Sequence, residues 1–178
     1  GGDKLFAVTS VAENEGKSTV ASNIALSLAD RGYNVVLFDL DAKKPALYKI
    51  FEESYNEFSE LGELFENKIK YSEFKLRKYK KSSLYLAINT KPYPSYRSWI
   101  ESGEVERVLS ALKTKVDYII VDTAPLSVDA SVTDIVKIVD KTMMVVRTDV
   151  VTASSLNDAL VTLHEVGGDV LGCVLNDV

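Results

Sequence analysis

The sequence contains very little cysteine and no long apolar run, and each absence excludes a class of protein. Cys173 is the only cysteine, so no internal disulfide can form and we expect a reducing compartment. No apolar stretch reaches the roughly 18 residues that a membrane-spanning helix needs. The chain does not open with the pattern of a secretory signal peptide. Because Cys173 lies in the apolar run Val170–Leu175, we expect it to be a small core residue.

The chain also lacks an excess of positive charge, which disfavours nucleic acid as a partner. Its 178 residues carry a formal net charge of -5, and an acidic domain is poorly suited to a phosphate backbone. An apolar share of 46% and a charged share of 26% are typical of a globular protein. We expect residues 1–178 to form one domain cut from a longer protein, because strand-like runs begin and end almost at the two termini.

Short apolar runs alternate with segments of helical periodicity, without an internal repeat or a low-complexity linker. The runs predicted to be buried strands are Leu5–Thr9, Asn34–Asp39, Leu84–Ile88, Val116–Val121, Thr142–Val146 and Val170–Leu175. The predicted helices are Lys17–Asp30, with an apolar stripe of Val20, Ile24, Ala25 and Leu28 and a stop at Gly32, then Glu104–Leu112, Ser131–Ile138 and Ser154–Glu165. Strands that are apolar on both faces belong in a parallel sheet covered by helices. We therefore predict a doubly wound α/β fold, with a mostly parallel sheet and helices on both faces.

The segment Lys68–Lys81 is strongly basic, with Glu73 as its only acid. It is interpreted either as a solvated helix face or loop, or as a contact for an acidic partner or an anionic membrane surface.

A strand, a loop, the run Gly16-Lys17-Ser18-Thr19 and a helix follow one another in the order that a phosphate-binding loop requires. In such a loop, Val11–Thr19, backbone N–H groups point at phosphates and Lys17 adds a charge beside the β- and γ-phosphates. The Ser18 hydroxyl suits Mg²⁺. Expected ligands are ATP or ADP with Mg²⁺, and the expected nucleotide-binding residues are Asn14, Glu15, Gly16, Lys17, Ser18 and Thr19. Asn14 tolerates a left-handed backbone, and Gly16 allows a close approach to the ligand. We expect Lys17 on a surface loop, where replacement by Met abolishes turnover and changes stability little.

Two further apolar strands end in carboxylates. Val35–Asp39 is followed closely by Asp41, and the run from Tyr118 leads into Asp122. Hard Mg²⁺ prefers carboxylate oxygens beside the phosphates. In doubly wound sheets such ligands lie at the carboxyl ends of the strands. The predicted metal ligands are therefore Ser18, Asp39 and Asp122.

Together these motifs resemble those of bacterial tyrosine kinases (BY-kinases), the P-loop kinases of capsule and exopolysaccharide synthesis. Asp39–Pro45 resembles their Walker A′ motif, Asp122–Pro125 their Walker B motif, and Gly172–Asp177 their closing strand. The resemblance covers nearly the whole chain. The broader relatives are partitioning and septum-positioning ATPases, whose signature lysine is replaced here by Ala12, which favours the kinase branch.

The resemblance implies a protein-tyrosine autokinase with Lys17, Asp39, Asp41 and Asp122 as catalytic residues. Asp41 or Asp39 would orient and deprotonate the tyrosine hydroxyl, and Thr19 would touch the α-phosphate. Asn176 resembles the residue on the adenine side. The resemblance also implies a membrane-embedded activator protein or domain, a ring-shaped homo-oligomer and a tyrosine-bearing protein substrate. The domain would be cytoplasmic, at the inner face of the plasma membrane.

Two other functions stay open at this point. A regulatory switch ATPase of the partitioning type is one, because the tyrosine cluster that the family phosphorylates is missing and Tyr118 is the last tyrosine. A nucleotide-binding scaffold without catalysis is the other, since Val11 and Ala124 depart from the usual motifs. Asp129 is interpreted either as a helix N-cap or as a further residue of the site.

Overall fold

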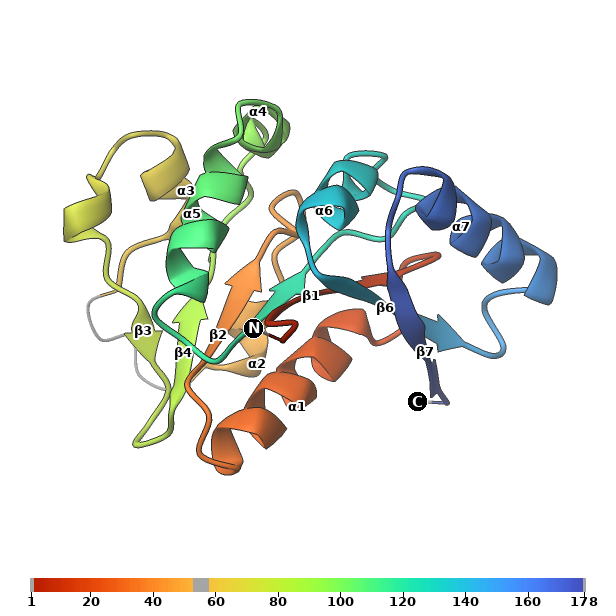
Figure 1. Cartoon of the computed structure of the whole chain (residues 1–178), viewed down its shortest axis with the longest axis horizontal. Coiled ribbons are helices and arrows are strands. Elements are labelled where there is room, and N and C mark those ends of the chain that lie inside the picture. The colour runs from red at the N-terminus through yellow and green to blue at the C-terminus, as the bar shows by residue number, and fades with distance from the viewer. Residues whose placement is uncertain (1, 53–57, 178) are drawn as a thin grey trace.

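The computed structural model describes residues 2–52 and 58–177, and within them seven strands form one sheet (Figure 1). The strands are β1 (Leu5–Ser10), β2 (Val35–Asp39), β3 (Arg77–Lys78), β4 (Leu84–Ala87), β5 (Tyr118–Asp122), β6 (Lys141–Arg147) and β7 (Val170–Asn176). Their order is β3-β4-β2-β5-β1-β6-β7. Neighbouring strands are parallel except β3 and β4, which are antiparallel. The predicted sheet is confirmed, and β3 is an addition that the sequence patterns did not indicate.

Helices cover both faces of the sheet, as predicted. They are α1 (Lys17–Asp30), α2 (Leu47–Ile50), α3 (Leu61–Phe65), the 3₁₀ turn η1 (Tyr71–Glu73), α4 (Tyr96–Glu101), α5 (Glu104–Lys113), α6 (Val132–Ile138) and α7 (Ala153–Glu165). Alternate residues of β2 face opposite cores: Val36 and Phe38 pack with α4 and α5, whereas Val35 and Leu37 pack with α1 and α2. A third cluster joins α6 and α7 to β6. The period-two alternation of fully buried residues confirms the doubly wound α/β fold.

Helix α1 packs on the sheet mainly through small residues; of the predicted stripe, Ala25 is fully buried and the three larger residues pack against the edge of the same core cluster. Ala21, Ala25 and Ala29 are buried, whereas Val20, Ile24 and Leu28 are only partly buried. Small side chains let the helix lie close to β2 and β5, and its larger apolar residues reach the flank near β7 instead. The predicted stop is confirmed, because Gly32 adopts a positive φ of 92° and its N–H donates to the carbonyl of Ala29.

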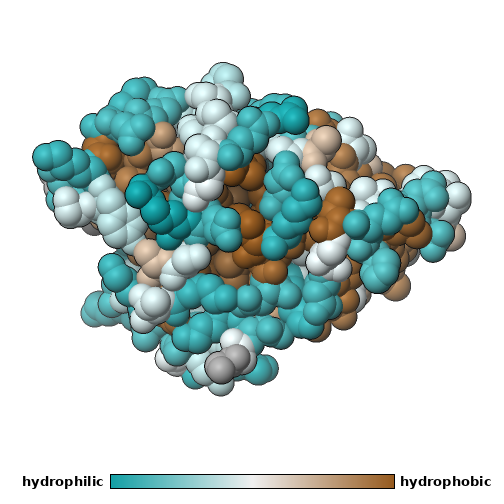
Figure 2. Space-filling model, turned by 45° about the horizontal axis from the view of Figure 1, so that its top comes forward, coloured by the Kyte–Doolittle hydropathy of each residue, from teal (hydrophilic) through white to brown (hydrophobic). Residues whose placement is uncertain are grey.

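Strand β7 is an edge strand, and the prediction that Cys173 is a core residue is wrong. Cys173 is exposed, and Leu171 and Leu175 beside it are 58% and 69% exposed. An edge strand has a neighbouring strand on one side only. Hydrophobic side chains accordingly reach the surface toward the end of the molecule where α7 and β7 lie (Figure 2). In the described ranges, none of the helices combines the length and the apolar character needed to cross a membrane.

The basic segment Lys68–Lys81 contains the opposite edge of the sheet. It runs through η1 into β3, and its lysines are exposed, whereas Arg77 is buried. A lysine on an edge strand hinders pairing with another sheet, which gives Lys78 of β3 a structural reason. Contact of this segment with an acidic partner or a membrane remains a prediction.

Candidate nucleotide and phosphoryl-transfer site

The predicted site residues meet where three neighbouring strands end. Strands β2, β5 and β1 are adjacent, and Asp39 of β2 is the register partner of Asp122 of β5. The loop that follows β1 leads into α1, so the amino end of a helix of 14 residues lies beside these two acids. In a doubly wound sheet this arrangement places a ligand at the carboxyl ends of the strands.

Lys17 is the centre of the site, and it is not the exposed loop residue that the sequence suggested. The residue is 6% exposed, and its ammonium lies 2.7 Å from Asp122 Oδ1 and 3.4 Å from Asp41 Oδ2. The Ser18 hydroxyl donates to the other Asp122 oxygen at 2.7 Å. Burial alone would lower the pKa of Lys17, but the carboxylates of Asp122, Asp41 and Asp39 outweigh it and raise that pKa. Lys17 is therefore a fully charged group in a buried acidic cluster.

The two acids of the Walker A′ segment differ in access. Asp39 is fully buried, and its oxygens accept the N–H groups of Asp41 at 3.1 Å and Asn89 at 3.5 Å. Its pKa is raised well above the usual value, mainly by burial and then by repulsion from Asp122 and Asp41. Asp41 is 8% exposed and its pKa is also raised, chiefly by burial, although Lys17 opposes the rise.

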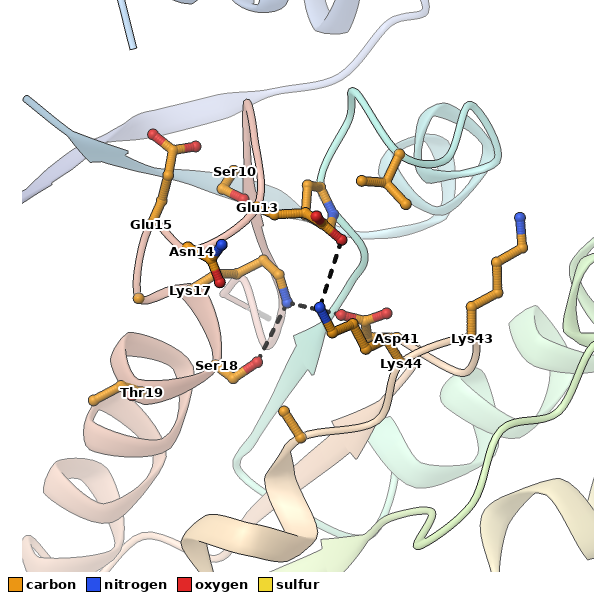
Figure 3. A pocket seen from close by; sticks show the side chains of 14 residues that line it. Ser10, Glu13, Asn14, Glu15, Lys17, Ser18, Thr19, Asp41, Lys43 and Lys44 are labelled. Atoms are coloured by element: carbon orange, nitrogen blue, oxygen red, sulfur yellow. Dashed lines mark hydrogen bonds and ion pairs between the residues drawn. The ribbon is translucent and has the colours of Figure 1, made fainter. Parts of the chain in front are cut away.

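A cavity of about 200 Å³ lies above these residues. Its walls are Ser10, Glu13, Asn14, Glu15, Gly16, Lys17, Ser18, Thr19, Asp41, Lys43, Lys44, Ala46, Pro125 and Val128. Figure 3 shows Lys17, Ser18 and Asp41 directed toward one another, whereas Lys43 points away from them. Lys44 reaches across to Glu13 of the phosphate loop, with 3.8 Å between ammonium and carboxylate. The cavity thus brings together the phosphate loop, the Walker A′ segment and the start of the segment after β5.

The phosphate loop is held in shape by contacts that no local pattern indicated. Glu15 was expected to bind nucleotide, but its side chain points away from the cavity (Figure 3) and is buried. Its carboxylate accepts the N–H of Ala12 at 2.7 Å and the N–H of Arg147, at the end of β6, at 3.0 Å. Only the backbone of Glu15 is therefore available to a phosphate. Asn14 adopts the left-handed conformation that was foreseen, with φ of 61°.

Asn176 lies against the loop from the end of β7. Its side-chain amide donates to the carbonyl of Glu15 at 3.0 Å. A Cβ atom on Gly16 would come within 2.0 Å of that amide nitrogen, and Gly16 has a φ of 78°. Glycine is therefore favoured here by its own backbone conformation, and any Cβ would have to displace the Asn176 side chain. The structure places Asn176 beside the phosphate loop, and its predicted role on the adenine side stays a prediction.

The residues present suit Mg²⁺ only when phosphate oxygens share its coordination. Among the described residues, no group of three or more His, Cys, Asp or Glu side chains is arranged to hold a metal. Mg²⁺ commonly takes one or two carboxylates together with substrate phosphates and water. Ser18 and Asp122 are already in hydrogen-bond contact, and Asp39 is the register neighbour of Asp122. Ser18 lines the cavity and is bonded to Asp122, and the set of Ser18, Asp39 and Asp122 as metal ligands stays a prediction.

Asp129 does not occupy the helix N-cap position, which was one of its two interpretations. The residue before α6 is Ser131, and its own side chain makes no capping bond. Asp129 Oδ1 instead accepts the N–H and the hydroxyl of Ser131 at 2.9 and 2.7 Å. Asp129 does not line the cavity either.

Comparison with known proteins identifies the family to which the chain belongs. The sequence model of the ParA family, described as NUBPL iron-transfer P-loop NTPase, matches residues 3–177. The protein named putative tyrosine-protein kinase CapB of Staphylococcus aureus is 31% identical over 97% of this chain and 75% of its own length. Tyrosine-protein kinase CpsD of Streptococcus pneumoniae is 30% identical over 98% of this chain and 77% of its own. The crystal structure of the chimerical protein CapA2B2 has the same fold, with a TM-score of 0.88 at 24% identity over 100% of this chain and 77% of that one. The chain therefore belongs to the bacterial tyrosine-kinase family of CapB and CpsD, a branch of the P-loop NTPases related to ParA.

Proposed function

We propose that this domain transfers the γ-phosphoryl group of ATP to a tyrosine hydroxyl of a protein involved in capsule or exopolysaccharide synthesis. The observation that carries the proposal is the position of Asp41, which lines the same cavity as Lys17 and Ser18. A phosphate loop with one Walker B acid suffices for nucleotide binding. A second carboxylate facing the phosphate cavity provides what an incoming hydroxyl needs, namely orientation and a proton acceptor.

Asp41 is a better candidate for that base than Asp39. Asp41 faces the cavity, whereas Asp39 is fully buried and uses one oxygen to accept the Asp41 N–H. Burial raises the pKa of Asp41 and so makes it a stronger base than a free carboxylate. In the transfer, the tyrosine proton passes to Asp41 while the tyrosine oxygen bonds to the γ-phosphorus. The bond from that phosphorus to the β–γ bridging oxygen breaks, and ADP leaves.

Lys17 and the loop N–H groups would hold the phosphates during this step. The Lys17 ammonium rests on Asp122 and Asp41, so entering phosphates compete with these carboxylates for it. Ser18, Asp39 and Asp122 would hold Mg²⁺, which supplies charge neutralisation at the phosphates when it is bound. Much of the remaining rate comes from positioning of the acceptor.

Delivery of the acceptor is the part that we assign to partners. We infer a membrane-embedded activator, a ring of copies of this domain and a location at the cytoplasmic face of the membrane. A structure similar to this chain is that of a chimerical protein, CapA2B2, which is consistent with a kinase that works together with a second polypeptide. Without these partners, we expect the domain to bind nucleotide and to phosphorylate slowly.

The test is phosphotyrosine formation, measured by mass spectrometry after incubation with ATP, Mg²⁺ and a tyrosine-rich peptide. Asp41→Asn should lower phosphotyrosine formation by about 100-fold or more while ADP binding is kept. Asp158→Asn is the matched control, because Asp158 is an exposed residue of α7 that does not line the cavity. Lys17→Met should lose both phosphotyrosine formation and ADP binding. Steady phosphate release without phosphotyrosine, even with the native activator present, would leave a switch ATPase as the function.

A further inference from the structure

Asp129 is a buried carboxylate whose local contacts explain only one of its two oxygens. The residue is 6% exposed and belongs to the segment between β5 and α6. Oδ1 accepts both hydrogen bonds from Ser131. Oδ2 is buried and has no hydrogen-bond partner among the described residues. Its ion-pair partner is Lys43, whose ammonium lies 3.3 Å away. A buried carboxylate needs such compensation, so the second oxygen points to a role beyond the turn at Ser131.

The Lys43 side chain, which is 53% exposed, lies against polar and aromatic groups of two other segments. Tyr96 of α4 is 1% exposed, and the ammonium lies 5.8 Å from the centre of its ring. The Tyr96 hydroxyl is hydrogen bonded to the Ser131 hydroxyl at 2.9 Å, which in turn donates to Asp129. A lysine over an aromatic face and beside a carboxylate is attracted by both. Three segments, from α4, from the approach to α6 and from the chain after β2, therefore meet at Lys43.

Lys43 stands two residues after Asp41, in a segment without regular secondary structure. Strand β2 ends at Asp39, and α2 begins at Leu47. Two hydrogen bonds tie the backbone between them to distant parts of the chain, from the Leu40 N–H to the Asp122 carbonyl and from the Tyr93 N–H to the Ala42 carbonyl, both 2.8 Å long. The Lys43 side chain adds an anchor just beyond these two bonds.

We propose that Asp129 is a positioning residue that acts through Lys43. The ion pair anchors the irregular chain after β2 to the segment before α6, and this anchor keeps Asp41 facing the phosphate cavity. Asp129 touches neither nucleotide nor acceptor in this role. The inference rests on the proposed function for its catalytic consequence, whereas its structural part, the anchoring of residues 40–46, stands independently of the reaction.

The experiment combines a mutant cycle with hydrogen exchange on the whole chain. Asp129→Asn keeps a side-chain oxygen that can accept from Ser131 but removes the negative charge. Lys43→Met removes the positive charge of the ion pair, and Lys43→Arg keeps it. We expect amide exchange in residues 40–46 to become several-fold faster in Asp129→Asn and Lys43→Met, and to stay near wild type in Lys43→Arg. The catalytic constant for phosphotyrosine formation should fall by about tenfold in the first two variants, while KM for ATP stays within about twofold in Asp129→Asn, whose side chain does not line the cavity.

The double variant decides whether the two residues act as one unit. Because each single change breaks the same contact, Asp129→Asn with Lys43→Met should be no worse than either alone. The proposal would be overturned if the activity losses of the two single variants multiplied in the double variant. It would also be overturned if amide exchange in residues 40–46 stayed unchanged in the single variants. If the wild-type chain makes no phosphotyrosine, the tyrosine-kinase function fails, and the exchange data still decide whether Asp129 anchors the segment.

Discussion

Replacement of Lys17 by Met should lower the free energy of unfolding by several kilocalories per mole, in addition to abolishing turnover. The ammonium is the cation of a buried cluster, 2.7 Å from a carboxylate of Asp122 that is fully shielded from solvent. Its removal leaves Asp122, Asp41 and Asp39 together without a counter-charge. Loss of one partner of a buried ion pair typically destabilises a protein by about 3–5 kcal/mol. That is a large part of the roughly 5–15 kcal/mol that holds a domain together.

The pH dependence of this loss distinguishes electrostatics from packing. Without Lys17, the pKa values of Asp39 and Asp41, already raised in the folded protein, rise further. The folded variant then binds protons more tightly than the unfolded chain, so its stability falls as the pH rises through the interval up to these raised values. The slope is limited to about 1.4 kcal/mol per pH unit for each proton. The cost of Lys17→Met should therefore be smaller near about pH 5 than near about pH 8.

The assay is urea denaturation followed by circular dichroism, with nucleotide absent, at both pH values. Lys44→Met is the control, because Lys44 is 76% exposed and pairs with Glu13 at 3.8 Å; it should change stability by less than about 0.5 kcal/mol. Adding Asp39→Asn to Lys17→Met should restore part of the loss. A cost below about 1 kcal/mol near about pH 8, or the same cost at both pH values, would refute the reasoning.

Two further predictions concern the same loop and acids. Asp39→Asn should stabilise the nucleotide-free domain, most clearly at pH values above the ordinary pKa of aspartate, because the raised pKa of Asp39 means that its ionisation opposes folding. The same variant should weaken the Mg²⁺ dependence of nucleotide binding. If neither Asp39→Asn nor Asp122→Asn changes the Mg²⁺ titration, these acids are purely structural. Gly16→Ala should weaken ADP binding strongly, because a Cβ would lie 2.0 Å from the Asn176 amide nitrogen and the φ of 78° is strained for alanine. Asn176→Gly should recover part of the Gly16→Ala loss in the same calorimetric titration, and no recovery at all would assign the whole effect to the backbone.

The sequence alone determined the fold class and the residue types of the site, because both depend on local patterns. Apolar runs mark strands buried on both faces, and Gly16-Lys17-Ser18 between a strand and a helix marks a phosphate loop. Carboxylates that directly follow two such strands were expected near that loop, and the register of Asp39 with Asp122 confirms the expectation. The sequence did not distinguish the roles of Asp39 and Asp41, since both lie at the end of the same apolar run.

Tertiary structure decided what depends on contacts between distant parts of the chain. Lys17 is buried because three strand ends surround it, which the motif does not reveal. Glu15 serves the loop through the backbone of Arg147, 132 residues away. Cys173 is exposed because β7 is an edge strand, and an apolar run reads the same at an edge as at the centre of a sheet. Local sequence indicates the structural preference of each segment, whereas the burial of a residue and its contact partners depend on the position of its strand in the sheet.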